Sequence, residues 1–484
     1  MTFLQKLPEQ TFAVLALFFY TGSIKPFIGV GHPAEPIVML LPHVATVVTL
    51  LLLSLRWEKT LTTLLRAPLL CALLFLVAVS PFWSASPADT WAKIAPLLRV
   101  TLFGLYLSSR YSFKEILQIM AWALGLAAGL SLVFGAALPS YGVMGRGYIG
   151  QSQDWTHEGA WRGVYIHKVV LGSMMSLSVL TSLYLTSWKN PLRPLAYLAL
   201  PLAVICLLMS TTKAALAALI VVIGCIPLYR TLRWEPKRVL LSWGIGLPLF
   251  VGAIAAVLSN ASLILQAMGK NTTLSGRTEM WPLVLENIAQ QPWFGYGYES
   301  FWIGGWEGPA ANVWVYLPFG FEPPHAHNGF LDIVLSVGIV GFALFLLNVL
   351  AYVWRAVRWV RTIPTAEGLA PLLLLTFMAL VNITETVWMT PDIFWLSFTA
   401  FAWAIAKPIP SQFSTASLSA ANSGYELWPV EVEALAKGQP IPDGIALQTV
   451  TPVDLKAMNL DLAAITSKIK TTAQQQKNPQ TRRH

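Results

Sequence analysis

The stretch GFLDIVLSVGIVGFALFLLNVLAYV, residues 329–353, contains a single charged side chain, Asp332. A helix of this length, at about 1.5 Å per residue, is longer than the roughly 30 Å hydrocarbon core of a bilayer. The stretch therefore predicts a membrane-spanning helix. Two histidines and an asparagine stand directly before it, His325, His327 and Asn328.

The composition predicts a chain that crosses the membrane many times. Of the 484 residues, 55% are hydrophobic and 11% are charged, and the mean hydropathy is +0.60. These values exclude an ordinary soluble globular protein. The net charge of +9 lies in short gaps between apolar runs, so we expect the lipid bilayer as a partner and no nucleic acid. The cysteines, Cys71, Cys206 and Cys225, lack metal-ligand spacing and predict neither disulfides nor a zinc site.

Apolar runs of roughly 20 residues recur along the chain and predict about 12 transmembrane helices. They occupy residues 9–24, 34–55, 67–83, 94–109, 115–138, 164–186, 192–209, 212–229, 238–258, 329–353, 367–387 and 391–407. We therefore predict an all-α polytopic membrane protein. Its expected parts are N-terminal transmembrane helices (1–138), a first long extracytoplasmic loop (139–163), central transmembrane helices (164–258), a large extracytoplasmic loop with a surface helix (259–328), C-terminal transmembrane helices (329–407) and a cytoplasmic, partly disordered tail (408–484).

Basic residues predict the orientation, because cytoplasmic loops carry an excess of Lys and Arg. Alternate short loops contain Arg56, Lys59, Arg66, Arg110, Lys114, Lys189, Arg193, Arg230, Arg233, Lys237, Arg238, Arg355, Arg358 and Arg361. These loops and both termini are expected in the cytoplasm. The two long loops then lie outside, and the second is expected to hold a helix from Thr278 to Gln290 with one apolar face, formed by Trp281, Val284, Leu285 and Ile288.

Further cations stand in or near the extracytoplasmic ends of the predicted spans, namely Arg99, Arg146, Arg162, Lys168, Lys213 and Arg277. A charge close to hydrocarbon is costly, so several charges at one face predict an anionic partner. Arginine suits a diphosphate, because its guanidinium donates to two oxygens at once. The alternative is that these side chains extend to the interface or pair with Asp and Glu.

His325 and His327 admit three interpretations. A His-x-His pair could bind a metal ion, but no third ligand stands at a recognisable spacing, so we predict no metal. A neutral imidazole could accept a proton from a sugar hydroxyl as a general base. A histidine could instead cap the helix that begins near Gly329. Tryptophans of the long loops could stack on sugars or form an interfacial belt; they are Trp155, Trp161, Trp281, Trp293, Trp302, Trp306 and Trp314.

Four segments carry a family resemblance: WRGVYIHKVVLG (161–172), LLMSTTKAALAAL (207–219), GKNTTLSGRTEMWPLVLENIAQQPWFGYGYESFW (269–302) and HAHNGFLDIVLSVGIVGFALF (325–345). Together they resemble the bacterial O-antigen ligase and polymerase superfamily, and within it exopolysaccharide polymerases most. The most specific parts are Gly-Arg-Thr followed by Trp and then Pro-x-x-Gly-x-Gly, and His-Asn before a Gly-x-x-Gly helix. The resemblance covers about residues 140–400.

The resemblance implies a membrane glycosyltransferase (GT-C-like) fold that moves a glycan from a polyprenyl diphosphate carrier to an acceptor. It maps the family's catalytic histidine onto His327. It also implies cations that hold the donor diphosphate, for which the candidates here are Arg277, Arg162, Lys213, Lys168 and Arg99, and we expect the acceptor or its sugars to meet Asn328, Trp302, Tyr298 and His325. The chain departs from the family where Val169 follows Lys168 in place of Asn, and where Lys213 replaces Arg.

The leading hypothesis is polymerisation of polyprenyl-diphosphate-linked repeat units into an exported polysaccharide, without cofactor or metal and with inversion. An acceptor glycan and chain-length regulator proteins are the other expected partners. The alternatives are ligation of a finished glycan to a lipid A core or a protein, and transport of a small anion such as bicarbonate, for which Asn382 and Glu385 could serve equally well. We expect the bacterial cytoplasmic (inner) membrane as the location, with the active site extracytoplasmic.

Overall fold

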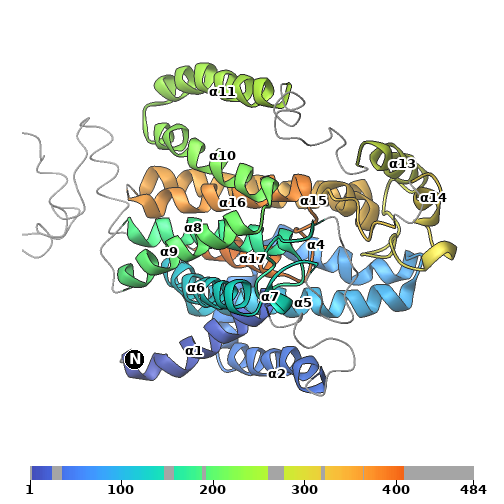
Figure 1. The fold of residues 1–484 in the computed structure, drawn as a ribbon, viewed down its shortest axis with the longest axis horizontal. Coiled ribbons are helices and arrows are strands. Elements are labelled where there is room, and N and C mark those ends of the chain that lie inside the picture. The colour runs from blue at the N-terminus through green and yellow to red at the C-terminus, as the bar shows by residue number, and fades with distance from the viewer. Residues whose placement is uncertain are drawn as a thin grey trace, which may run out of the picture.

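The computed structural model describes residues 3–23, 35–145, 157–187, 192–259, 277–317, 322–363 and 365–407. Predictions about Arg146, Trp155 and the tail 408–484 lie outside these residues. The described part of the chain is helical, and within it Val143 and Trp161 form one isolated β-bridge. Figure 1 shows the long helices running side by side.

A helix occupies each apolar range predicted from the sequence. The long helices are α1 (Phe3–Tyr20), α2 (Glu35–Ser54), α4 (Pro68–Val79), α5 (Pro87–Arg110), α6 (Phe113–Ala137), α8 (Lys168–Thr186), α9 (Arg193–Met209), α10 (Lys213–Arg230), α11 (Pro236–Ser259), α15 (Gly329–Thr362), α16 (Ala366–Thr384) and α17 (Ile393–Ala404). Shorter elements are α3 (Trp57–Leu64), α7 (Pro139–Gly142), α13 (Arg277–Gln290), α14 (Ala311–Trp314), η2 (Ser80–Trp83), η4 (Thr231–Arg233) and η5 (Gly305–Glu307).

Five described helices are long and apolar enough to cross a membrane, namely α6, α8, α10, α15 and α16. A sixth span results if α2 and α3, which meet at a bend of 97°, are counted as one. The chain is therefore a polytopic membrane protein. The finer expectation of about 12 spans stays a prediction, because several of the remaining helices are shorter than a bilayer crossing requires.

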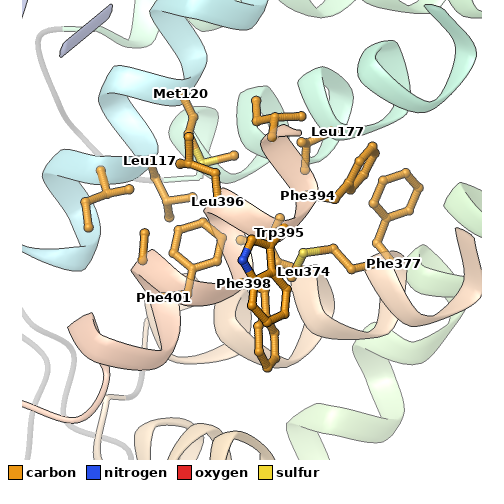
Figure 2. Close-up of a cluster of buried hydrophobic side chains, with 14 of the residues drawn as sticks. Leu117, Met120, Leu177, Leu374, Phe377, Phe394, Trp395, Leu396, Phe398 and Phe401 are labelled. Atoms are coloured by element: carbon orange, nitrogen blue, oxygen red, sulfur yellow. The ribbon is translucent and has the colours of Figure 1, made fainter. Parts of the chain in front are cut away.

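The core is built around α17. Every residue of this helix is buried, and its sequence is apolar on all sides, as expected for a helix that other helices surround. Figure 2 shows Trp395 and Phe398 of α17 between side chains of α6, α8 and α16. The indole N–H of Trp395 donates to Thr101 Oγ1 of α5 at 2.9 Å, so the buried polar atom has a partner.

Three helices begin and one ends at the same end of the bundle, which we call the site end: the starts of α8, α10 and α15 and the end of α16. Thr212 Oγ1, just before α10, donates to the carbonyl of Lys168 at 2.9 Å. The N–H of Gly329 donates to the carbonyl of Glu385 at 3.2 Å. Arg233, just after α10, donates to the carbonyl of Ile363, so α10 and α16 are antiparallel and the start of α10 lies toward the end of α16.

Helices α13 and α14 lie together beyond the bundle, beside the start of α15 (Figure 1). Helix α13 begins one residue before the predicted Thr278 and ends at the predicted Gln290. Its predicted apolar face is wrong at Leu285, which is 55% exposed, whereas Met280 and Val284 are fully buried. The buried side of α13 therefore faces the loop and α15, and is shifted by about one residue position from the predicted face.

Helix α15 is broken at Gly338, whose φ of 65° and ψ of −171° are not helical. The chain segment 292–296, which we call the inserted loop, supplies hydrogen bonds that the break removes. Ile339 N–H donates to the carbonyl of Pro292 at 2.7 Å, and Tyr296 N–H donates to the carbonyl of Leu335 at 2.7 Å. A break in a membrane helix is tolerated where protein re-satisfies the backbone in this way.

Replacing Gly338 tests this joint. A Cβ at Gly338 would overlap the carbonyl of Trp293, and its backbone conformation is one that essentially only glycine adopts. We expect Gly338→Ala to destabilise the protein by about 1–3 kcal/mol, seen as a lower thermal unfolding midpoint in detergent. Gly129→Ala in α6 is the control, because a Cβ there meets nothing within 4 Å. Equal midpoints for the two variants would contradict the assignment.

Candidate active site

Three side chains from separate elements meet at the site end. His327 stands just before α15, Glu385 stands just after α16, and Arg277 is the first residue of α13. The Nδ1 atom of His327 lies 3.7 Å from Oε2 of Glu385, and Nη2 of Arg277 lies 3.5 Å from Oε1 of the same carboxylate. Arg277 Nη2 also donates to the carbonyl of Thr384 at 2.8 Å. One carboxylate is thus shared between a guanidinium and an imidazole.

The segment that carries the histidines is held tightly by hydrogen bonds. His327 N–H donates to Nδ1 of His325 at 3.2 Å. Between them, Ala326 is fully buried, and its carbonyl accepts from the indole N–H of Trp281 at 2.9 Å. His327 itself has a φ of 49°, in the left-handed region that non-glycine residues seldom adopt. Such backbone strain persists where surrounding contacts hold it, and it concentrates at functional sites.

The electrostatics of the two histidines differ. Burial, and next the charge of nearby His327, lowers the pKa of His325 to about 4, so His325 is neutral at pH 7. His327 Nδ1 is buried and has no hydrogen-bond partner, since 3.7 Å from Glu385 exceeds hydrogen-bond distance. Catalytic hydrogen bonds are often long in unliganded sites and shorten with substrate. His327 is therefore placed to use Glu385 as its orienting partner.

The same residues could be considered as metal ligands. His325, His327 and Glu385 each offer one ligand atom, and these atoms lie within 4.8 Å of one another. Glu385 is the third ligand that sequence spacing did not reveal, and a His₂Glu set is known for zinc. Two features oppose a metal ion. Nδ1 of His325 already accepts a backbone N–H, and the guanidinium of Arg277 competes for the carboxylate.

Two of the other predicted cations come together at the site end. Lys168 is the first residue of α8 and Lys213 is the first residue of α10, and Thr212 links them through its hydrogen bond to Lys168. Arg277 is likewise the first residue of its helix. A cation at a helix N-terminus opposes the helix dipole, and an anion bound there would relieve both charges. Lys213 is exposed, so its ammonium is accessible.

Arg162 is buried, with an exposed fraction of 4%. Its Nε donates to the carbonyl of Tyr141 at 2.6 Å, and burial lowers its pKa. In the described parts of the chain, no carboxylate lies within salt-bridge distance of this guanidinium. Trp161, the preceding residue, donates its N–H to the carbonyl of Met209 at 2.9 Å. Arg162 therefore lies near the turn that leads into α10.

Two predicted site residues do not join the cluster. Arg99 stands 12 residues after Pro87, the start of α5, and so lies about 18 Å along the helix from the site end. Tyr298 is 1% exposed, and its hydroxyl donates to the carbonyl of Met389 at 2.7 Å. Tyr298 is thus a packed core residue, and the expectation that it lines a sugar site is corrected because its ring has no free face.

Asn328 and Trp302 have structural partners. The side chain of Asn328 caps α15 by accepting the N–H groups of Phe330 and Leu331 at 3.1 and 3.4 Å. The cap that was considered for a histidine is thus an asparagine. The indole N–H of Trp302 donates to Oδ1 of Asp332 at 2.8 Å, while the ring stays partly exposed.

The sequence analysis assigned no role to Asp332. A signal existed, because Asp332 is the only charge in the apolar run 329–353, and a charge in such a run is a functional hypothesis by default. Glu385 was noted, with pairing to a cation as one interpretation, and the pair with Arg277 confirms that interpretation.

The fold and the site together define a polytopic, helical membrane protein with a shared Arg, Glu and His cluster at one end of the bundle. Residues 196–346 match the family described as O-Antigen ligase. The chain is also 26% identical over 280 residues to the "Exopolysaccharide production protein ExoQ" of Rhizobium meliloti (strain 1021). That match covers 56% of this chain and 61% of the relative, so it spans less than two thirds of the relative's length.

These two matches place the chain in the O-antigen ligase and polymerase superfamily, near exopolysaccharide polymerases. The resemblance described from the sequence is confirmed. The family match ends within α15 and includes Arg277, His325 and His327, but not Glu385. The class of activity that follows is a polysaccharide-related ligase or polymerase.

His325 gives a test of the site's electrostatics. Its pKa in the folded protein, about 4, is below the ordinary value near 6.5, so the unfolded chain binds more protons between these values. We therefore expect stability to fall as the pH falls from 6.5 to 4. In His325→Gln this part of the pH dependence should disappear, as measured by thermal unfolding midpoints across that range. Midpoints at pH 8 report the lost contacts alone, and an unchanged slope below pH 6.5 would refute the burial argument.

Proposed function

We propose that this protein is a membrane glycosyltransferase that polymerises polyprenyl-diphosphate-linked oligosaccharide repeat units into an exported polysaccharide. The observation that carries the proposal is the meeting of His327, Glu385 and Arg277 at the site end. It supplies a base, a group that orients the base, and a cation for a leaving group within one cluster. Similarity to a protein named for exopolysaccharide production supports the choice of product.

The reaction requires one displacement. A hydroxyl oxygen of the acceptor sugar attacks the anomeric carbon of the donor, and a new glycosidic bond forms. The bond from that carbon to the diphosphate oxygen breaks, and its electron pair leaves with the diphosphate. A single in-line displacement inverts the anomeric carbon. Because the donor is already activated, the protein contributes alignment, a proton acceptor and charge neutralisation.

His327 is proposed as the proton acceptor. Its Nδ1 is the ring nitrogen that faces Glu385, so a proton on Nδ1 would be stabilised by the carboxylate. The other ring nitrogen, Nε2, then takes the proton of the attacking hydroxyl. Glu385 also stabilises the imidazolium that forms, in the way that a carboxylate supports a catalytic histidine elsewhere. His325 supports the backbone of His327 by accepting its N–H.

Arg277, Lys213 and Lys168 are proposed to hold the donor diphosphate, with Arg162 as a further cation of this end. Arg277 can donate in a fork to two oxygens, whereas each lysine acts as a point charge. Binding of the diphosphate would compete with Glu385 for Arg277. The carboxylate would then be left to His327, so donor binding and activation of the base are linked.

A second candidate is ligation of a finished glycan to a lipid A core or a protein, and the description of the matching family as O-Antigen ligase favours it. The two reactions share donor chemistry and differ in the acceptor. Incubation of the purified protein with lipid-linked repeat units alone separates them. A polymerase makes a ladder of products, whereas a ligase needs an added lipid or protein acceptor.

The proposal includes a location and a topology. The site end faces the extracytoplasmic side of the inner membrane, and both termini lie in the cytoplasm. The support is the excess of Lys and Arg in the loops at the opposite end, of which Arg355 and Arg361 are bonded to carbonyls there. An acceptor glycan and chain-length regulator proteins would meet the protein at the site end.

Removal of the base tests the mechanism. We expect His327→Ala to lower the turnover of lipid-linked repeat units by about 10²- to 10⁴-fold, the usual contribution of a general base. Product ladders resolved by gel electrophoresis measure the loss. His157→Ala, at a histidine outside the cluster, is the matched control and should retain activity. Polymer formation at the parental rate by His327→Ala would rule out the general-base role.

Arg277→Lys and Arg277→Ala give a second comparison in the same assay. Loss of the fork with retention of charge should reduce turnover less than loss of both, and Arg277→Ala should cost about 10²- to 10³-fold. Parental turnover by Arg277→Ala would remove this residue from the diphosphate site.

Metal dependence has its own test. We expect protein washed with EDTA to keep its activity, because an imidazole and cations suffice for the proposed step. The readout is polymer formation before and after chelation, with added Mg²⁺ or Zn²⁺ as the control. Loss of activity on chelation and its return with one of these ions would assign His325, His327 and Glu385 as metal ligands.

A further inference from the structure

Asp332 is buried at the first turn of α15 and accepts hydrogen bonds from three donor groups on three segments. The N–H of Ala326 contacts both carboxylate oxygens at 3.1 Å. The indole N–H of Trp302 donates to Oδ1 at 2.8 Å, and the hydroxyl of Thr386 donates to Oδ2. Asp332 is 8% exposed. Since every partner donates, the arrangement suits an ionised carboxylate, which can only accept.

The position of Ala326 makes this network relevant to the site. Ala326 separates the two histidines and is fully buried. Its N–H is bound by Asp332, and its carbonyl is bound by Trp281 of α13. Both backbone polar groups of the residue before His327 are thus held by side chains from different elements. The next residue, His327, has the strained φ of 49°.

The network also joins the two sides of the cluster. Thr386 follows Glu385 directly, so Asp332 holds the residue before His327 and the residue after Glu385 with one carboxylate. Movement of either segment would change the separation of His327 Nδ1 and Glu385 Oε2, which is 3.7 Å. The helix dipole favours an anion at this place, the first turn of α15.

We propose that Asp332 is a positioning residue, which holds His327 in its strained conformation and in register with Glu385 by binding Ala326 and Thr386. The proposal rests on the role of His327 given above and adds a residue to which that function assigned nothing. Asp332 does not itself contact the reacting groups, because both of its oxygens are occupied by protein donors.

The variant Asp332→Asn keeps the shape and replaces one accepting oxygen by a donating amide, which would face an N–H or O–H donor. We expect turnover to fall about 10- to 100-fold, as for other groups that orient a catalytic side chain. The deciding measurement is the same substitution in a His327→Ala background. A residue that acts through His327 should cause little further loss of the residual activity there, so the two effects are not additive.

Asp392→Asn is the matched control. Asp392 is a partly buried carboxylate that caps α17 by accepting the N–H groups of Phe394 and Trp395, and it has no hydrogen bond to the histidine segment. Its loss should reduce turnover by the same factor with and without His327. If Asp332→Asn behaves in this additive way, or retains parental activity, the positioning role is wrong.

A second variant keeps the test decisive if Asp332→Asn does not fold. Thr386→Val removes one donor and leaves the carboxylate in place, and we expect a loss of several-fold that is again absent with His327→Ala. An additive loss in Thr386→Val overturns the proposal. Full activity of His327→Ala alone would instead refute the proposed function, so the two failures are distinguishable.

Discussion

A polar backbone group without water must find its partner within the protein, and this constraint shapes the site end. The chain enters α15 through a segment in which hydrogen bonds from His325, Asn328 and Asp332 occupy successive backbone N–H groups. Trp281 occupies the one carbonyl between the histidines. The side chains that satisfy the backbone are thus the same ones that surround His327. Stability and the aim of the imidazole have a common origin here.

Electrostatics adds a second layer to this arrangement. Glu385 compensates Arg277 in the unliganded protein, so the cluster does not leave a guanidinium unpaired beside an apolar bundle. Lys168 and Lys213 have no such carboxylate among the described contacts, and both stand where the helix dipole opposes them. The site end therefore carries positive charge that an anionic lipid headgroup could neutralise. This is the physical reason for preferring a diphosphate-linked donor to a neutral one.

The positions of the helices were predictable because hydrophobic length is a local property. Each long apolar run became a helix, and α13 was predicted to within one residue at its start. The break at Gly338 was not predictable, since it depends on hydrogen bonds to Pro292 and Trp293, more than 40 residues earlier in the chain. Periodicity within a segment carries no information about a loop that packs into it.

The site followed the same rule. His327 and Arg277 were identified through motifs that lie within single segments. The partnership of Glu385 with both of them depends on how α13, α15 and α16 meet, and no spacing along the chain expresses that. Asp332 was visible as a lone charge, but its meaning came from Ala326, Trp302 and Thr386. Tyr298 shows the opposite error, because an aromatic residue near a motif was assigned to substrate and belongs to the core.

The break in α15 separates a short outer segment, residues 329–337, from the long remainder of that helix. His327 is therefore mounted on a stub of about two and a half turns rather than on a rigid rod anchored deep in the bilayer. The pivot of that stub is clasped by residues 292–296, which belong to the same connection as α13 and α14. A ligand that shifts this connection would swing the imidazole as a lever swings about its fulcrum, while the membrane-embedded part of the helix stays still.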